Sequence, residues 1–303
     1  QHFGEGAEAF PVFNGTGANV VGLQSMLPRW GAVVAASTAH INVDEGGAPE
    51  RVAGIKILNV PTPDGKLTPE LIDREAWGWG DEHRAQPLVV SITQSTELGT
   101  LYTPGEIRAI ADHVHARGMR LHLDGARISN AAAALDLPLR AFTRDAGVDV
   151  LSFGGTKNGA MLGEAIVVLD PAASEGLPFL RKLNMQLSSK MRFVSAQLIA
   201  LLEGDLYLRN ARHANEMAAR LRAAVEAGLD DGTISGVAFT QPTQSNGVFA
   251  TLPDGVADRL RQSFRFYDWD AAKNEVRWMC SFDTTEADVD AFVAELSRLT
   301  TAR

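Results

Sequence analysis

The feature that most constrains the fold is an apolar strand that ends in two glycines and a lysine. Residues 148–153 are almost entirely apolar, Gly154 and Gly155 follow, and Lys157 comes two positions later. An apolar run of this length between glycines is typical of a buried strand in an α/β sheet. Ligands of such sheets bind beyond the carboxyl ends of the strands, where a lysine can act as a nucleophile. Taken alone, however, the stretch favours an ordinary solvated lysine.

A second apolar strand ends in an acidic residue. Residues 119–123 lead into Asp124, and Gly125 and Ala126 form a tight turn. Because parallel strands place their carboxyl ends on one rim, we expect Asp124 and Lys157 to face the same pocket. A lysine that forms a Schiff base and a carboxylate that pairs with a pyridinium nitrogen are the two groups that pyridoxal phosphate requires.

A glycine-rich turn near the start of the chain is a candidate phosphate site. A short strand over residues 10–13 leads through Gly15, Thr16 and Gly17 into a helical run over residues 20–27. Helix N-termini bind phosphate, glycines let the backbone approach closely, and the threonine adds its hydroxyl and amide as donors. Such turns also occur without a ligand. The order of phosphate loop, aspartate and lysine along the chain is much more specific.

The chain resembles the threonine aldolase and β-eliminating lyase family of fold-type-I pyridoxal phosphate enzymes over nearly its whole length. The motifs that carry the resemblance are residues 14–19 (NGTGAN), His40 with Glu45-Gly46-Gly47, residues 122–127 (HLDGAR) and Gly155-Thr156-Lys157. The resemblance implies an α/β fold, in which a fold-type-I transferase-like large domain with a mainly parallel sheet binds the cofactor and a small α+β domain follows. We expect the large domain over residues 1–204 and the small domain over residues 205–303. The family normally carries a further N-terminal segment that lines the active site, and we expect it to be missing here.

The resemblance also implies roles for three residues at strand ends. His40 becomes the histidine that stacks on the cofactor ring, although its own stretch favours a histidine satisfied in the first turn of a helix. Thr96 follows an apolar strand and is expected to approach the cofactor. Glu97 stands where many threonine aldolases have a histidine, so both His40 and Glu97 are candidates for the base that takes the β-hydroxyl proton.

Basic residues complete the predicted site. Arg277 lies in an otherwise apolar strand, where an arginine needs an anionic partner. That partner is either an acidic side chain, in a structural salt bridge, or, as the resemblance implies, the α-carboxylate of a substrate. The planar guanidinium group suits a carboxylate geometrically. Arg127, beside Asp124, is a second candidate for the substrate carboxylate and for the cofactor. Lys190 and Arg192 indicate a solvated basic turn on their own, whereas the resemblance places them near the phosphate, often across a subunit interface.

The sequence therefore predicts a pyridoxal phosphate enzyme that breaks the Cα–Cβ bond of a β-hydroxy-α-amino acid. Substrates of this kind are L-threonine, allo-threonine and phenylserine, and the products are glycine and an aldehyde. The alternative is β-elimination on a small amino acid with the same cofactor. A non-catalytic ligand-binding domain is a third interpretation, but no DNA-binding helix-turn-helix module accompanies it.

Charge and composition limit the classes of molecule that the protein can bind. A formal net charge of −9 argues against nucleic acid and anionic membranes, which attract basic surfaces. The single cysteine, Cys280, excludes an internal disulfide and suits a reducing cytoplasm. His113 and His115 lie two apart in a predicted helix and point in different directions, so no metal site is predicted. By resemblance we expect a small-molecule amino-acid substrate and a homodimer or homotetramer.

Patterns elsewhere predict the supporting structure. We expect the tail of a helix and a turn over residues 2–8, a helix over residues 69–77, and a strand over residues 164–169 that runs antiparallel to its neighbour. A long amphipathic helix is expected over residues 205–227. One strand of the small domain is expected over residues 264–267.

Overall fold

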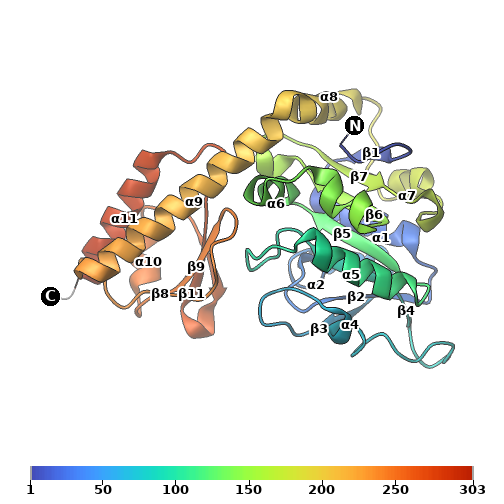
Figure 1. Cartoon of the computed structure of the whole chain (residues 1–303), viewed down its shortest axis with the longest axis horizontal. Helices are drawn as coiled ribbons and strands as arrows, with labels where there is room; N and C mark the ends of the chain where they lie inside the picture. Colours follow the sequence, from blue (N-terminus) through green and yellow to red (C-terminus); the bar gives the residue numbers. More distant parts are fainter. Residues whose placement is uncertain (1, 302–303) are drawn as a thin grey trace.

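The computed structural model describes residues 2–301, which form a seven-stranded sheet flanked by helices and a separate four-stranded sheet (Figure 1). The strand order of the large sheet is β1-β7-β6-β5-β4-β2-β3. The central strands pair in parallel, while β7 runs antiparallel to both β6 and β1. This confirms the mainly parallel sheet and the antiparallel strand that the sequence predicts. The strands are β1 (Glu8–Val12), β2 (Gly31–Ala36), β3 (Lys56–Val60), β4 (Gln86–Thr93), β5 (Arg120–Gly125), β6 (Val150–Gly154) and β7 (Glu164–Val168).

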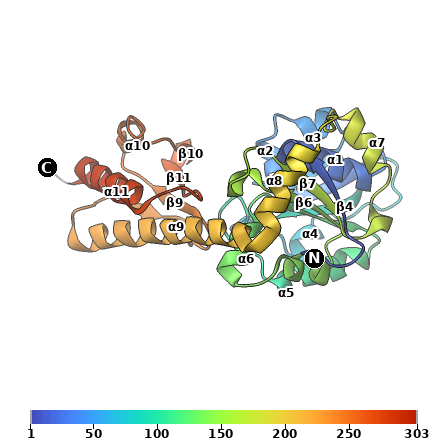
Figure 2. The same ribbon diagram turned by 90° about the horizontal axis from the view of Figure 1, so that it is seen from above.

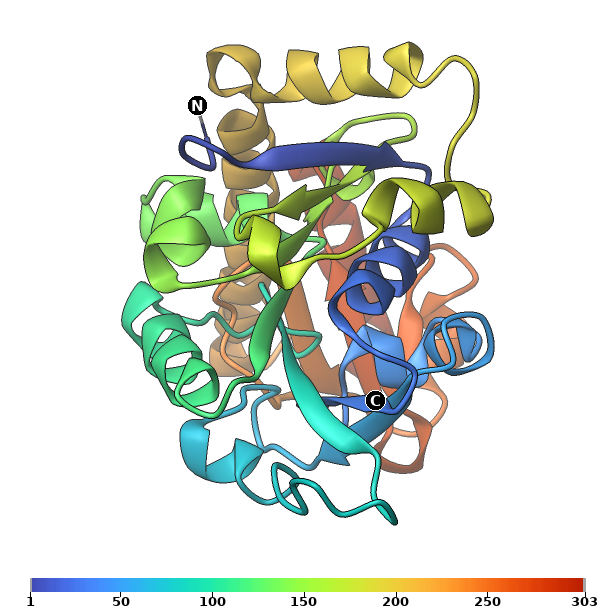
Figure 3. The ribbon, with the colours of Figure 1, turned by 90° about the vertical axis from the view of Figure 1, so that its right-hand side faces the viewer.

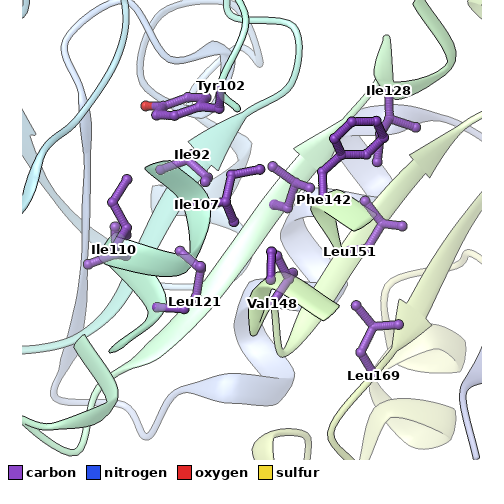
Figure 4. Packing of buried hydrophobic residues seen from close by; sticks show 14 of the residues in the cluster. Ile92, Tyr102, Ile107, Ile110, Leu121, Ile128, Phe142, Val148, Leu151 and Leu169 are labelled. Atoms are coloured by element: carbon purple, nitrogen blue, oxygen red, sulfur yellow. The ribbon is translucent and has the colours of Figure 1, made fainter. Parts of the chain in front are cut away.

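Helices cover both faces of the large sheet, because strands such as β2, β6 and β7 are buried on both sides. In β6, Val150 packs into one core with α1, whereas Leu151 and Phe153 pack into the other with α5 and α6. Figure 4 shows this second core, in which Ile107 and Ile110 of α5 lie near Leu121. The helices are α1 (Gly15–Met26), α2 (His40–Val43), α3 (Ala48–Arg51), α4 (Pro69–Ile72), α5 (Pro104–His115), α6 (Ile128–Leu135), α7 (Leu177–Leu183) and α8 (Arg192–Leu202).

The small sheet is antiparallel, in the order β10-β11-β9-β8. Its core side is covered by α9 and α11, whose apolar residues pack with Val276 and Trp278. The elements are α9 (Leu206–Asp231), β8 (Ala238–Phe239), β9 (Gly247–Thr251), α10 (Val256–Leu260), β10 (Tyr267–Asp270), β11 (Glu275–Met279) and α11 (Glu286–Thr300). Together with the large sheet, this arrangement is the predicted α/β fold with a small α+β unit.

The long helix α9 belongs to both units (Figure 2). Near its start, Tyr207 is buried in the large core, and further along Leu221 and Val225 are buried in the small core. Asn215 fastens the helix to α6, because its amide donates to the backbone carbonyl of Asn130 at 2.9 Å and its carbonyl accepts from the Asn130 amide at 3.1 Å. We propose the domain division at residue 204, because every buried residue of the small core belongs to α9 or follows it in the chain.

Three predicted segments have different structures. Residues 2–7 contain the predicted turn but not the predicted tail of a helix, and β1 starts at Glu8. The helix predicted to reach residue 77 ends at Ile72, and the side chain of Arg84 donates hydrogen bonds to the carbonyls of Glu75 and Trp77. The strand predicted over residues 264–267 starts only at Tyr267, because Phe264 and Phe266 are packed against the small core.

Two further features concern the outside of the molecule. Helix α8 lies along β1 at one edge of the large sheet (Figure 3). Within residues 2–301, no helix has both the length and the apolar character needed to cross a membrane.

Candidate active site

The carboxyl ends of β4, β5 and β6 open into one cavity of about 360 Å³. This volume is within the range of small-molecule sites. The large unit contributes most of the lining, and the small unit closes one side with residues 265–267, Arg277 and Met279. The residues from the large unit are Gly15, Asn19, His40, Asp44, Glu45, Thr93, Glu97, Asp124, Ala126, Arg127 and Lys157.

Lys157 enters the cavity from a short 3-10 helix, η3 (Thr156–Asn158), that follows β6. The glycine pair makes this approach possible, because a Cβ on Gly154 would lie 2.5 Å from the carbonyl oxygen of Ala126, and one on Gly155 would lie 2.6 Å from that of Gly163. Burial, and then the nearby Arg127, lower the pKa of the Lys157 ammonium. The lysine is therefore more readily available as a neutral amine than an ordinary surface lysine.

Asp124 ends β5 directly opposite Thr93 on β4, so both side chains project into the cavity. Both carboxylate oxygens are held. Oδ2 accepts a hydrogen bond of 2.9 Å from the Asn19 amide, and Oδ1 accepts one of 3.0 Å from the backbone N–H of Ala126. These two hydrogen bonds fix the orientation of the carboxylate in the cavity.

His40 is the first residue of α2, and the loop that follows this helix returns a carboxylate to its ring. Nδ1 of His40 lies 3.0 Å from Oε1 of Glu45, a carboxylate whose side chain is fully buried. The same Oε1 accepts a hydrogen bond of 2.8 Å from Asn19, the residue that also holds Asp124. The hydrogen bond from His40 to Glu45 is the main cause of the raised pKa of His40.

Glu97 lies behind His40 and faces the cavity. Its Oε1 accepts hydrogen bonds of 2.9 Å from the backbone N–H of His40 and from the hydroxyl of Thr93. Burial, and then the charge of Asp124, raise the pKa of the Glu97 carboxyl. Oε2 is buried and has no hydrogen-bond partner among residues 2–301. These features are those of a protonatable carboxyl group next to the candidate base.

Thr96 is placed differently from the prediction. Its hydroxyl lies 2.7 Å from that of Thr100, and the residue is not part of the cavity lining. Thr93, three residues earlier, lines the cavity instead. Because Thr93 lies opposite Asp124 in the sheet, it shares the face of that aspartate, whereas Thr96 lies beyond the strand in a hydrogen-bonded turn.

The two predicted arginines meet at the cavity from different units. Arg127 follows β5 and Arg277 lies on β11, and neither forms an ion pair within residues 2–301. Burial lowers the pKa of Arg277, and burial together with the charge of Arg277 lowers that of Arg127 to about 10. Two guanidinium groups without a carboxylate partner form a site for an anionic ligand. The structural salt bridge that was the alternative for Arg277 is not found among the described residues.

The phosphate loop forms the N-terminus of α1. Asn14 caps this helix by accepting a hydrogen bond of 2.7 Å from the Gly17 amide, which leaves the amides of Gly15 and Thr16 for a ligand. Gly17 also lies close to another side chain. A Cβ there would lie 2.4 Å from the terminal amide group of Gln186, which would have to move.

Lys190 and Arg192 lie outside the cavity. Both are exposed at the start of α8, and the guanidinium of Arg192 lies 4.9 Å from the ring centroid of Phe193. Within one chain they do not reach the phosphate loop residues that line the cavity. Their predicted contact with the cofactor therefore requires a second subunit.

Sequence reasoning did not include Asn19 and Glu45 among the site residues. Both belong to the motifs that carry the family resemblance, and both are almost fully buried despite being polar. A buried polar residue needs partners. The signal was therefore present, but the sequence alone does not show which groups they join.

The donors and acceptors of the cavity fit pyridoxal phosphate. Asp124 can pair with a protonated ring nitrogen, the Lys157 amine can bind the aldehyde carbon, and the amides of Gly15 and Thr16 can bind the phosphate. Buried atoms without a partner among the described residues, such as Nε of Arg277 and Oδ1 of Asn19, further indicate a polar occupant.

Comparison with known proteins decides the family. The family described as beta-eliminating lyase matches residues 2–249. The chain belongs to this family. It is 41% identical to a low specificity L-threonine aldolase of a Pseudomonas species over 297 residues, which are 97% of this chain and 84% of the relative. It is also 41% identical to the Pseudomonas aeruginosa protein of that name, over 98% of this chain and 84% of the relative.

A solved structure supports the same assignment. The threonine aldolase of Leishmania major superposes with a TM-score of 0.89 at 32% identity, covering 97% of this chain and 84% of that one. As a member of this family, the protein is a pyridoxal-phosphate-dependent lyase with the predicted fold.

Proposed function

We propose that this lyase is an aldolase that cleaves the Cα–Cβ bond of β-hydroxy-α-amino acids into glycine and an aldehyde. The observation that carries the proposal is that one cavity contains Lys157, Asp124, a histidine held by a carboxylate, and two arginines without ion pairs. Relatives named low specificity L-threonine aldolase, 41% identical over most of the chain, support the same reaction.

Each group has a separate task in this proposal. Bound pyridoxal phosphate supplies a ring that accepts the electrons released at Cα when the bond breaks. Lys157, Asp124, His40 and the amides of Gly15 and Thr16 are the groups that would hold the cofactor. The carboxylate of Asp124, which is buried and fixed by hydrogen bonds to both oxygens, would pair with a protonated pyridine nitrogen.

The arginines orient the substrate. Arg127 and Arg277 bind the α-carboxylate, and their guanidinium groups fix its plane through paired hydrogen bonds. Because one arginine lies on each unit, the carboxylate is held between the two. This grip determines which bond at Cα faces the reacting side of the site.

His40 takes the proton of the β-hydroxyl group, so that the oxygen becomes the carbonyl oxygen of the aldehyde. Its ring is partly exposed and its Nδ1 is occupied by the hydrogen bond to Glu45, so Nε2 is the ring nitrogen that can take the proton. Glu97 is the alternative base, but one of its oxygens already accepts two hydrogen bonds. We therefore assign the base role to His40 and keep Glu97 as its neighbour.

β-Elimination is the alternative reaction, and the description of the matching family supports it. The two reactions give different products. The test incubates the purified enzyme with L-threonine and with L-phenylserine, and measures glycine and aldehyde against ammonia and keto acid. Equal amounts of glycine and aldehyde are expected. Keto acid without glycine would contradict the aldolase assignment.

We also propose that the protein works as a homodimer or homotetramer in the cytoplasm. Large apolar side chains of α7, α8 and the connecting turn are exposed, including Phe179 at 80%, Leu183 at 71% and Met185 at 78%. Lys190 and Arg192 follow these residues in the chain and are exposed, so a second copy packed on this surface could receive these cations. The single cysteine fits a reducing compartment.

A further inference from the structure

The environment of Glu45 singles it out among the carboxylates of the cavity. Its side chain is fully buried, and its Oε1 contacts two groups, His40 Nδ1 at 3.0 Å and the Asn19 amide at 2.8 Å. Burying a carboxylate costs free energy of solvation, which hydrogen-bond donors around it must offset. The two donors that contact Glu45 are therefore the groups on which it acts.

We propose that Glu45 is a positioning residue that keeps His40 protonated on Nδ1, so that Nε2 is the atom that takes the β-hydroxyl proton. The inference deepens the proposed aldolase function, on which it rests. It concerns the direction in which the imidazole presents its lone pair.

The tautomer follows from the chemistry of the partner. An ionised carboxylate can only accept, so the nitrogen that faces Glu45 must carry the hydrogen. In the neutral imidazole the lone pair then lies on Nε2, the basic atom. When Nε2 takes the hydroxyl proton, the ring becomes a cation beside the buried carboxylate. The reaction as a whole consumes no proton, because the one lost by the hydroxyl equals the one gained by Cα when glycine forms.

Asn19 extends this arrangement to the cofactor side of the cavity. Its amide nitrogen donates one hydrogen bond to Glu45 and a second, of 2.9 Å, to Asp124. Both hydrogens of one NH₂ group are thereby used on two carboxylates. The amide lies between the two carboxylates and gives each of them a donor. Asn19 thus links the carboxylate that holds His40 to the carboxylate of Asp124.

Other charged groups around His40 do not determine its tautomer. The Asp44 carboxylate lies 3.6 Å from Nε2, but it is 72% exposed and is screened by solvent. Glu97 contacts the backbone N–H of His40 rather than its ring. The charge of Asp124 raises the pKa of His40 and that of Lys157 lowers it, and both effects are smaller than that of the hydrogen bond to Glu45.

The decisive variant is Glu45→Gln, which keeps the size and removes the charge. The measurement is the pH dependence of kcat and KM for aldehyde release from L-threonine by the holoenzyme. We expect kcat to fall by about tenfold to a hundredfold, less than loss of a general base itself, with little change in KM. Because the carboxylate that raises the pKa of His40 is gone, the acid limb of the profile should move to lower pH.

Two further variants separate positioning from structure. Glu45→Asp retains the charge and should keep the acid limb near its native position. Glu50→Gln removes an exposed carboxylate from the neighbouring helix α3 and should behave as the native enzyme. A normal acid limb in Glu45→Gln, at any level of activity, would overturn the proposal.

The tautomer itself is measured independently of catalysis. Holoenzyme labelled with ¹⁵N histidine is examined by NMR near neutral pH, and the His40 signals are identified by their loss in His40→Asn. Protonation at Nδ1 in the native protein is expected, whereas protonation at Nε2 alone would contradict the role of Glu45 even if every Glu45 variant failed to fold. A protein with Nδ1 protonated but without glycine formation from any β-hydroxy amino acid would refute the aldolase function and leave the positioning intact.

Discussion

The amide nitrogen of Asn19 lies 2.9 Å from Oδ2 of Asp124, so the first helix of the chain holds the carboxylate at the end of the fifth strand. The second oxygen of this carboxylate is held by the backbone N–H of Ala126. The position of Asp124 is therefore fixed before any ligand binds, which lets its charge act without reorganisation in the transition state.

This relationship predicts the effect of Asp124→Asn. We expect kcat to fall on the order of a hundredfold or more, and KM to change much less, because the lost charge matters most as electrons reach the ring. Steady-state kinetics with L-threonine measure both parameters. Asp112→Asn, an exposed aspartate of α5, is the control. A raised KM with intact kcat would contradict the assigned role.

Lys157→Ala should abolish the visible absorbance of the lysine-bound cofactor and reduce activity to background. The reason is that no other lysine is among the residues that line the cavity within the described chain. Borohydride reduction followed by peptide mapping should label Lys157 in the native protein. Lys56→Ala, on the exposed side of β3, should leave the spectrum unchanged. Labelling of a different lysine would refute the assignment.

Arg277→Lys should raise KM for the amino acid at least tenfold while cofactor absorbance stays normal. A lysine keeps the positive charge but cannot form paired hydrogen bonds to a carboxylate. The substitution also removes the contact with Trp269, whose ring centroid lies 5.3 Å from the guanidinium. Substrate titrations followed by absorbance distinguish binding from turnover. An unchanged KM would exclude Arg277 from the carboxylate site.

The raised pKa of Glu97 predicts that the free energy of unfolding depends on pH. Its pKa is raised by burial, so its contribution to stability is fully present below the ordinary glutamate pKa of 4.5 and is lost as pH rises toward the folded pKa. Each pH unit between the two values corresponds to about 1.4 kcal/mol. Relative to the native protein, Glu97→Gln should therefore gain stability as pH rises from 4 to 8. Urea denaturation at several pH values measures the difference in free energy of unfolding between the variant and the native protein. The control is Glu216→Gln, which changes an exposed glutamate. A difference that stays constant with pH would contradict the prediction.

The exposed apolar surface of α7 and α8 predicts the oligomer. Phe179→Asp should shift the light-scattering mass to a smaller species and lower activity, because a charge would be buried between subunits. Trp30→Asp changes another exposed aromatic residue, 67% accessible, away from these helices and should leave the mass unchanged. A native protein that is a fully active monomer would defeat the proposal.

The sequence predicted the parts of the site that local patterns determine. Asp124 and Lys157 each follow an apolar strand and a small-residue turn, and the rule for parallel strands brings them to one rim. The glycine pair after β6 could be recognised from the sequence. The structure adds the reason for it, because the backbone of Ala126 and of Gly163 comes too close for a side chain at Gly154 and Gly155. Patterns of this kind need no knowledge of distant contacts.

The remainder depends on tertiary contacts. Nothing local shows that Asn19 joins Glu45 and Asp124, which lie 26 and 105 residues further along the chain. Thr96 was predicted at the cofactor instead of Thr93, because the end of β4 and its pairing with β5 determine which side chain points inward. The strand predicted at residue 264 fails for a similar reason, since packing of the aromatic residues delays the strand.

Because α9 runs without a break from the large core to the small core, the number of residues in this helix determines how the small sheet is oriented at the active site. Tyr207 and Val225 are packed in different cores on the same helix, and β11, which carries Arg277, is packed on the far core. An α-helix turns by about 100° and advances by about 1.5 Å for each residue. One residue inserted between Asn215 and Leu221 would therefore rotate the small sheet as a body around the helix axis. Arg277 would leave the cavity even though no residue of the cavity had changed, so the length of this helix is under the same constraint as the catalytic residues.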